Sequence, residues 1–155
     1  MTAHETPVAL DDKAALAAMM RDYISAMAEV IPGIRTDAPY PEFDLYFGDT
    51  RNRWAFWLKA DQADAGFALV SRRTHVGRTE MEEFFVAAPF RRRGIGLAAA
   101  RRLILRFPGA WRITQRETNA PAIAFWHRVL DGFVTYDETT TSTDAVRRQQ
   151  TFVVG

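Results

Sequence analysis

The stretch at residues 84–96, FFVAAPFRRRGIG, constrains the chain most. An apolar run typical of a strand gives way to Arg91, Arg92 and Arg93, and then Gly94 and Gly96 open a new apolar segment. A helix that begins at a glycine turn offers free backbone N–H groups and the positive end of its dipole to an anion. Arginine adds forked donors that suit phosphate oxygens. The stretch predicts a phosphate site at a strand–turn–helix junction, although a plain turn with solubilising arginines fits the local pattern equally well.

Other phosphate-binding loops fit this stretch less well. Gly94, Gly96 and Ala99 satisfy the relaxed dinucleotide fingerprint, with Glu117 at a plausible distance for a ribose contact. In that fold the first glycine follows its strand almost directly, whereas residues 87–93 intervene here, and the chain after Glu117 is too short to complete a doubly wound sheet. A Walker-type loop is excluded because no glycine–lysine–serine or glycine–lysine–threonine follows the turn.

Composition limits the class of protein. A chain of 155 residues, 48% hydrophobic and 25% charged, predicts a single domain over residues 1–155. No stretch approaches the roughly 18 apolar residues of a membrane span, and the N-terminus lacks a signal-peptide pattern, so we expect a cytoplasmic protein with no membrane partner. The absence of cysteine excludes disulfides and a cysteine nucleophile, and three scattered histidines predict no metal site.

Periodicity and breakers predict one continuous α+β unit without repeats. The strand–helix–strand–helix order of the second half implies a parallel strand pair with helices packed on the sheet. The expected elements are a helix at 12–30, a loop at 31–50 with a helical turn near 43–47, a hairpin of strands 53–59 and 65–70, a basic loop at 71–78, a strand at 80–87, a helix at 94–106, a strand at 111–117, a helix at 120–130, and strands near 133–137 and 148–154.

A second motif follows the first at a characteristic distance. Residues 119–126 read NAPAIAFW, and Gly132 and Phe133 follow. With the RRRGIG loop after a strand, this order resembles the GNAT superfamily of acyl-CoA-dependent N-acyltransferases, in particular a subgroup of bacterial acetyltransferases. The resemblance covers about two thirds of the chain. It implies a GNAT-type domain with a mixed central sheet of six to seven strands and about four helices.

The resemblance also implies where acetyl-CoA binds. The loop and helix start would hold the pyrophosphate, and the pantetheine arm would lie along the splayed end of the strand. Asn119 would touch that arm, and Phe125 with Trp126 would flank the thioester, although Asn119 is also a good helix cap and both aromatic residues can be core. The implied coenzyme residues are Phe85, Val86, Arg91, Arg92, Arg93, Gly94, Ile95, Gly96, Leu97, Asn119, Phe125 and Trp126.

Catalysis in this family is direct attack of an amine on the thioester, for which a carboxylate can serve as general base. Glu80, Glu82 and Glu83 lie on the strand that leads to the thioester, and strand alternation predicts Glu80 and Glu82 on one face with Glu83 on the other. We favour Glu83 as the base and then Glu80, against the alternative that each is simply solvated. A backbone N–H near Val86 would polarise the thioester carbonyl.

One position departs from the family. Trp126 stands where many relatives have a tyrosine proposed as the acid that protonates the leaving thiolate, and an indole N–H cannot act as an acid near neutral pH. The thiolate then leaves unassisted or takes a proton from water, or Tyr136 or His127 substitutes. Alternatively, the chain is a non-catalytic acyl-CoA-binding sensor or interaction module.

The acceptor is least constrained. The acidic first third, with Asp37, Glu42, Asp44 and Asp49 near the expected acceptor wall, hints at a cationic primary amine on a small molecule or peptide. Near-zero net charge and the absence of a recognised motif argue against nucleic-acid binding by residues 91–106. Both a monomer and a homodimer are compatible with the sequence.

Overall fold

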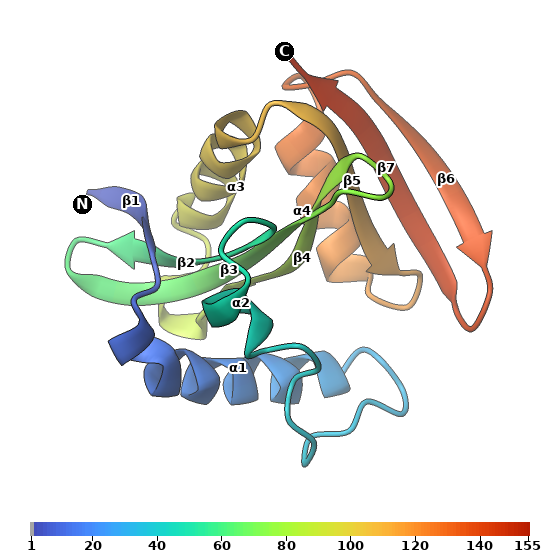
Figure 1. Cartoon of the computed structure of the whole chain (residues 1–155). Coiled ribbons are helices and arrows are strands. Elements are labelled where there is room, and N and C mark those ends of the chain that lie inside the picture. The colour runs from blue at the N-terminus through green and yellow to red at the C-terminus, as the bar shows by residue number, and fades with distance from the viewer. Residues whose placement is uncertain (1) are drawn as a thin grey trace.

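The computed structural model describes residues 2–155, which form one α+β domain around a seven-stranded mixed sheet (Figure 1). The fold class expected from the sequence is confirmed. In chain order the elements are β1 (Ala3–Pro7), a 3-10 turn (Leu10–Asp12), α1 (Lys13–Ala28), α2 (Leu45–Gly48), β2 (Arg53–Ala60), β3 (Ala63–Arg73), β4 (Arg78–Val86), a 3-10 turn (Ala88–Phe90), α3 (Ile95–Arg106), β5 (Gly109–Arg116), α4 (Ala120–Leu130), β6 (Tyr136–Ser142) and β7 (Val146–Val154).

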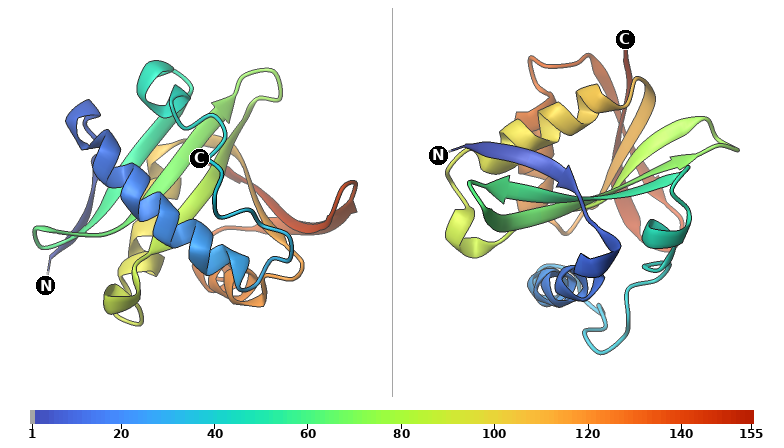
Figure 2. Two further views of the ribbon diagram at one scale, coloured as in Figure 1. Left: turned by 90° about the horizontal axis from the view of Figure 1, so that it is seen from below. Right: turned by 60° about the vertical axis from the view of Figure 1, so that its left-hand side comes forward.

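The strands lie in the order β1-β2-β3-β4-β5-β7-β6. Among the strand pairs of residues 2–155, β4 and β5 are parallel and the other neighbours are antiparallel, and β2 with β3 forms the predicted hairpin. Helices α3 and α4 cover one face of the sheet, and α1 with α2 covers the other, as the right-hand view of Figure 2 shows. This arrangement confirms the parallel pair expected from the second half of the chain.

Each face of the sheet has its own hydrophobic core, because successive strand residues point to opposite faces. Under α3 and α4 the core includes Val70, Leu103 and Trp111, which are fully buried. Under α1 and α2 it is built around Leu16 and Phe67, also fully buried. The strand β4 lies in the sheet between these two cores, which therefore fix the positions of its side chains.

Several expected boundaries were wrong. The edge strand β1 was not predicted, and it pairs with β2 at Thr6↔Trp57. The expected basic loop at 71–78 is shorter, a turn at 74–77, because β3 runs to Arg73 and β4 starts at Arg78, and these two residues pair across the strands. Near the C-terminus the strands extend over 136–142 and 146–154, so residues 133–135 precede β6.

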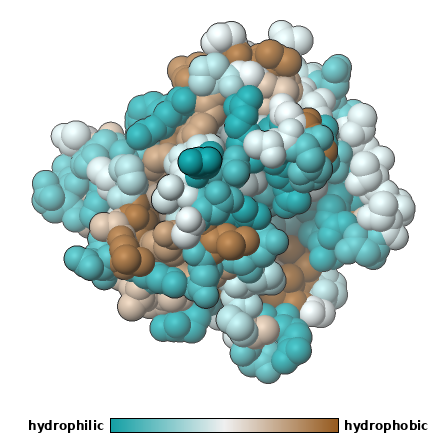
Figure 3. Space-filling model, in the orientation of Figure 1, coloured by the Kyte–Doolittle hydropathy of each residue, from teal (hydrophilic) through white to brown (hydrophobic). Residues whose placement is uncertain are grey.

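The surface seen in Figure 3 is mainly hydrophilic, with small separate apolar areas. The large apolar side chains that protrude belong to different elements, for example Leu10, Leu105 and Val153. Within residues 2–155, no helix combines the length and the apolar character that crossing a membrane requires.

Candidate active site

The two parallel strands separate along their length. β4 and β5 pair only at Thr79↔Trp111 and Glu80↔Arg112, whereas both strands continue for several residues beyond these pairs. The C-terminal half of β4 therefore has an edge without a strand partner. Such an edge offers main-chain donors and acceptors to a ligand that extends the sheet.

The main-chain groups at this open edge belong to alternate residues of β4. The N–H of Ala87 donates to the Ala65 oxygen at 2.8 Å, so residues 87 and 85 direct their main-chain N–H and C=O groups towards β3. Val86 and Phe84 consequently turn theirs towards the gap between β4 and β5. We predicted Phe85 and Val86 for this role; Phe84 was missed, because the direction of the main-chain groups depends on the pairing register with β3.

The loop after β4 has the backbone of an anion site. Arg92 and Gly94 both have positive φ, 62° and 77°, with Arg93 between them. The first α-helical bond of α3 runs from Ala98 N–H to Gly94 O at 3.2 Å, which leaves the preceding N–H groups of the first turn without helical acceptors. Successive N–H groups in such a conformation form a concave nest for an anion. Apart from its chain neighbours, no described residue lies within 4 Å of a Cβ built on Gly94, so its positive φ and not close packing favours glycine at this position.

The arginines before this loop are exposed. Arg91 Nε donates to Val86 O at 2.8 Å, and its guanidinium lies 5.6 Å from the centre of the Phe85 ring. Among the described residues, none of Arg91, Arg92 and Arg93 forms an ion pair with an acid, so their charge is available to an anionic ligand. Arg91 also fixes the loop to the end of β4.

The remaining residues of the two motifs form a packed wall beside the gap. A Cβ on Gly96 would lie 3.1 Å from Val86 Cγ2 and 3.3 Å from Phe125 Cε1, so this position favours glycine because of close packing. The ring of Phe125 stacks on Phe84 with centroids 5.4 Å apart, and Trp126, 6% exposed, meets Phe84 edge-on. Their aromatic rings thus belong to the core, where they also border the open edge of β4.

Three further motif residues have clear structural partners. Ile95 is buried beside Ala60 and Ala65, and Leu97 packs against the core under α3 and α4. Asn119 caps α4, since its Oδ1 accepts the Ala122 N–H at 3.3 Å. The capping alternative for Asn119 is therefore present in the structure.

The three glutamates of β4 lie on one face of the sheet, and the predicted separation of Glu83 from Glu80 and Glu82 was wrong. The pairing register shifts between Leu69 and Val70: Leu69 opposes Glu83, whereas Val70 opposes Met81. A bulge at Glu82 inserts one extra residue into β4. The side chains of Glu80 and Glu83, which are three residues apart, therefore point to the same face of the sheet. All three carboxylates consequently lie on the α1 face.

Glu80 and Glu82 are neutralised within the protein. Glu80, with a side chain 8% exposed, pairs with Arg112 and with Arg73 Nε, the latter at 2.7 Å. Glu82 accepts from Ser71 Oγ at 2.5 Å and pairs with Arg73 at 3.3 Å. These partners give Glu80 a structural role in joining β4 to β5.

Glu83 has hydroxyl partners instead of cations. Its Oε2 accepts the hydroxyl of Tyr23 from α1, and its Oε1 accepts the hydroxyl of Tyr40 at 3.0 Å. Burial raises the pKa of Glu83 to about 7, against the opposing effect of these two hydrogen bonds. A carboxyl that titrates near neutral pH has the properties of a general base.

The two substitutes considered for the missing tyrosine acid are bonded elsewhere. Tyr136 donates to Asp131 Oδ1 at 2.5 Å, and this bond raises the pKa of Tyr136 to about 12. His127 Nε2 lies 2.6 Å from Glu138 Oε1. Both contacts join α4 or its C-terminal end to β6, and neither reaches β4.

The four acids that hinted at a cationic acceptor are all paired. Arg53 binds Glu42 at 3.2 Å and Asp49 at 2.9 Å. Asp44 pairs with Lys13 at 2.7 Å, and Asp37 with Arg35 at 3.2 Å. Their charges are thus compensated locally. Of the three glutamates on β4, Glu83 is the one without a cation among its described partners.

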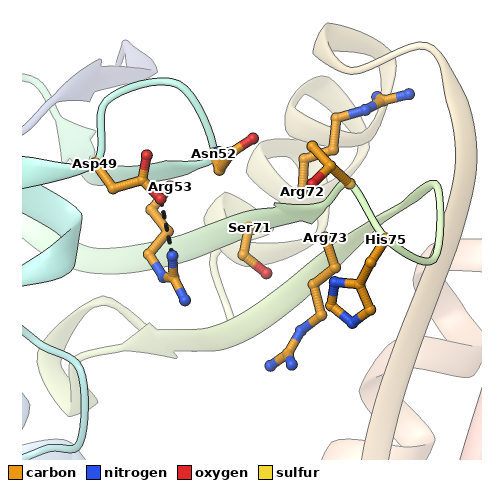
Figure 4. Close-up of a pocket in the computed structure, with 8 residues that line it drawn as sticks. Asp49, Asn52, Arg53, Ser71, Arg72, Arg73 and His75 are labelled. Atoms are coloured by element: carbon orange, nitrogen blue, oxygen red, sulfur yellow. Dashed lines mark hydrogen bonds and ion pairs between the residues drawn. The ribbon is translucent and has the colours of Figure 1, made fainter.

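A polar pocket of about 140 Å³ lies further along the same face, between the start of β2 and the end of β3 (Figure 4). Ser71 and Arg73 point into it from β3, and the pair formed by Asp49 and Arg53 lies opposite. Because Arg73 also binds Glu82, the pocket continues the surface that begins at the three glutamates. Its lining residues are Asp49, Asn52, Arg53, Ser71, Arg72, Arg73, Thr74 and His75.

We compared the chain with known protein families and with curated proteins. The model of the acetyltransferase (GNAT) family matches residues 16–131, about three quarters of the chain. The chain belongs to the GNAT family. No curated protein matches it significantly.

Solved structures show the same GNAT fold at low sequence identity. A ribosomal L7/L12 α-N-protein acetyltransferase in complex with coenzyme A superposes with a TM-score of 0.76 and 9% identity, covering 99% of this chain and 95% of that one. The ribosomal-protein-S18-alanine N-acetyltransferase of Escherichia coli gives 0.66 and 16%, with coverages of 99% and 95%. The protein yncA of Salmonella typhimurium, solved with acetyl-CoA, gives 0.71 and 12%, with coverages of 100% and 95%.

Proposed function

We propose that the protein transfers an acetyl group from acetyl-CoA to a primary amine of a small molecule or peptide, by direct attack of the amine on the thioester. The observation that carries the proposal is Glu83, a carboxyl with a pKa of about 7 and no cation partner in the described chain, on the strand whose edge is open. Membership of the GNAT family and neighbours solved with coenzyme A or acetyl-CoA support it.

The residues present fit acetyl-CoA. The N–H groups around Arg92, Gly94 and the first turn of α3 would hold the diphosphate, and the unpaired arginines would balance its charge. The open edge at Phe84 and Val86 would bind the pantetheine amides as an added strand. Asn119, Phe125 and Trp126 would border the arm, in addition to their cap and core roles. When bound, acetyl-CoA would supply a thioester whose carbonyl carbon can be attacked by an amine.

Glu83 has two tasks in this proposal. Its negative charge lacks a cation, so an acceptor that arrives as an ammonium ion would complete the pair. The carboxylate then takes the proton from the nitrogen, which frees the lone pair for attack on the thioester carbon. Glu80 is not the preferred base, because Arg73 and Arg112 already hold its carboxylate.

The main chain of β4 would assist the same step. The N–H of Val86, turned towards the gap, would donate to the carbonyl oxygen as it gains negative charge. The leaving thiolate needs no strong acid, because a thiolate is a moderate leaving group. After the attack the nitrogen carries one proton more than the amide product, and this proton would pass to the thiolate through water. The core position of Trp126 is compatible with this route, which requires no tyrosine at that position.

The experiment is a thiol-release assay with acetyl-CoA and four amines: n-butylamine, spermidine, tyramine and trialanine. These represent an alkyl amine, a polyamine, an aromatic amine and a peptide α-amine. We expect amine-dependent release by the wild type, a loss of at least about 100-fold in Glu83→Gln, within the typical contribution of a general base, and near-normal rates in the neighbour control Glu82→Gln.

The sensor alternative predicts a different pattern. Acetyl-CoA would then raise the melting temperature of the protein, but no amine would accelerate thiol release. Equal rates in Glu83→Gln and wild type would instead contradict the assignment of the base. Four further statements stay predictions: a cationic acceptor, a cytoplasmic location, a single domain over residues 1–155, and an oligomeric state of monomer or homodimer.

A further inference from the structure

The two tyrosine hydroxyls that bind Glu83 come from different kinds of segment, one from a helix and one from a connection between helices. Tyr23 belongs to α1, and its ring meets Phe67 and Phe85 edge-on, with centroids 5.6 and 5.5 Å away. Its hydroxyl is thus fixed by a helix and by an aromatic core. Movement of Tyr23 away from Glu83 would disturb both.

Tyr40 belongs to the long connection between α1 and α2 (Figure 1). In the described chain, no main-chain N–H of residues 32–42 donates to a main-chain oxygen. Two polar side-chain contacts attach the segment to the sheet, Tyr40 on Glu83 at 3.0 Å and Glu42 on Arg53 at 3.2 Å. The Tyr40 ring, which is partly buried, also packs against the edge of the core under α1 and α2. Few backbone hydrogen bonds mean that this segment can move at low cost.

The two tyrosines occupy different oxygens of the carboxylate: Tyr23 binds Oε2 and Tyr40 binds Oε1. An ammonium group is a hydrogen-bond donor like a phenol hydroxyl, so it can replace one of them at the same oxygen. A bond from a charged donor to a carboxylate is also stronger than one from a neutral hydroxyl. The exchange is favourable where the displaced group is free to leave.

We infer that Tyr23 and Tyr40 divide the hold on Glu83: Tyr23 positions the carboxylate throughout the reaction, whereas Tyr40 covers Oε1 until the acceptor amine displaces it. This inference rests on the proposed function of Glu83. Tyr40 is then a specificity-determining residue, because the acceptor must donate to Oε1 and move the 32–42 segment aside. An acceptor without such a donor leaves Tyr40 in place.

Two other titratable groups lie near Glu83. Glu82 precedes it on β4, and Tyr46 from α2 faces the same pair of carboxylates. With Tyr23 from α1 and Tyr40 from the connection, these are the titratable groups that interact with the Glu83 carboxyl. Tyr23→Phe and Tyr40→Phe each remove one hydroxyl and keep the ring, so a difference between them reports which contact persists.

The test uses two pH profiles of the full-length protein with acetyl-CoA and the fastest of the four panel amines. The acid limb of kcat/KM reports the free enzyme, and that of kcat reports the complex with substrate. For Tyr40→Phe we expect the kcat/KM limb to move up by about one pH unit, as expected for loss of a hydrogen bond to a charged group, while the kcat limb stays in place. For Tyr23→Phe we expect both limbs to move up.

The outcomes separate this inference from the proposed function. Equal movement of both limbs in Tyr40→Phe would show that Tyr40 remains bound in the complex and would overturn the inference. Full activity in Glu83→Gln, or no turnover of any panel amine, would overturn the proposed function instead. A titration of the carboxyl by NMR of carbon-13-labelled glutamate in the free protein tests the contact without turnover. An unchanged Glu83 titration in Tyr40→Phe would refute it.

Discussion

Replacing Glu83 by glutamine should change how stability depends on pH. In the folded protein the pKa of Glu83 is raised from 4.5 to about 7, mainly because burial disfavours the charged form. Between these two values the folded state holds a proton that the unfolded chain has released, so the contribution of Glu83 lowers the free energy of unfolding as pH rises. Glutamine stays neutral throughout and lacks this effect.

The size follows from the difference between the folded and unfolded pKa values. About 2.5 pH units at 1.36 kcal/mol per unit correspond to roughly 3 kcal/mol, all of it lost by about pH 8. For a domain of this size, 1 kcal/mol changes the melting temperature by about 2–4 °C. The melting temperature of Glu83→Gln should therefore rise relative to the wild type by roughly 6–12 °C between about pH 4 and pH 8.

Differential scanning fluorimetry at matched pH measures this relative change, and Glu82→Gln serves as the control. Glu82 lies on the same strand and face but is paired with Ser71 and Arg73. A constant difference between Glu83→Gln and the wild type across this pH range would refute the reasoning. The base would then titrate in its ordinary range, and the proposed route for the proton would lose its physical basis.

Three other changes test separate parts of the site. Gly96→Val should weaken acetyl-CoA binding by calorimetry by about tenfold or more, because the new side chain meets Val86 at 3.1 Å; unchanged affinity would contradict the close fit. Arg112→Ala should lower the free energy of unfolding in urea by up to about 3 kcal/mol, since the buried Glu80 loses a partner; a neutral result would remove its structural role. Asn119→Ala should cost about 1 kcal/mol through loss of the cap and Asn119→Ser should restore it, while weakened coenzyme binding in both variants would reveal a second role.

The helices and the interior strands could be predicted because their apolar periodicity is strong. The family follows from two local motifs, the RRRGIG loop and NAPAIAFW, whose order and separation are visible in the sequence. By contrast, β1 reads AHETP without an alternating apolar pattern, and its pairing with β2 depends on the sheet edge being available. A short edge strand of this kind has little local signal.

The arrangement of the glutamates could not be read from the chain. Whether Glu83 shares a face with Glu80 depends on a bulge opposite Leu69 and Val70, which the register with β3 determines. The partners Tyr23 and Tyr40 lie 60 and 43 residues away in sequence, so no local pattern connects them to the base. Spacing along the strand selected three candidate acids, and tertiary contacts distinguish between them.

The most direct test of the account follows the acetyl group itself. Mass spectrometry after incubation with carbon-13-labelled acetyl-CoA and the amine panel should find the label on an amine in the wild type, at most in traces with Glu83→Gln, and not on the protein. Label bound covalently to the protein as a kinetically competent intermediate, or label that never leaves coenzyme A, would contradict direct transfer at this site.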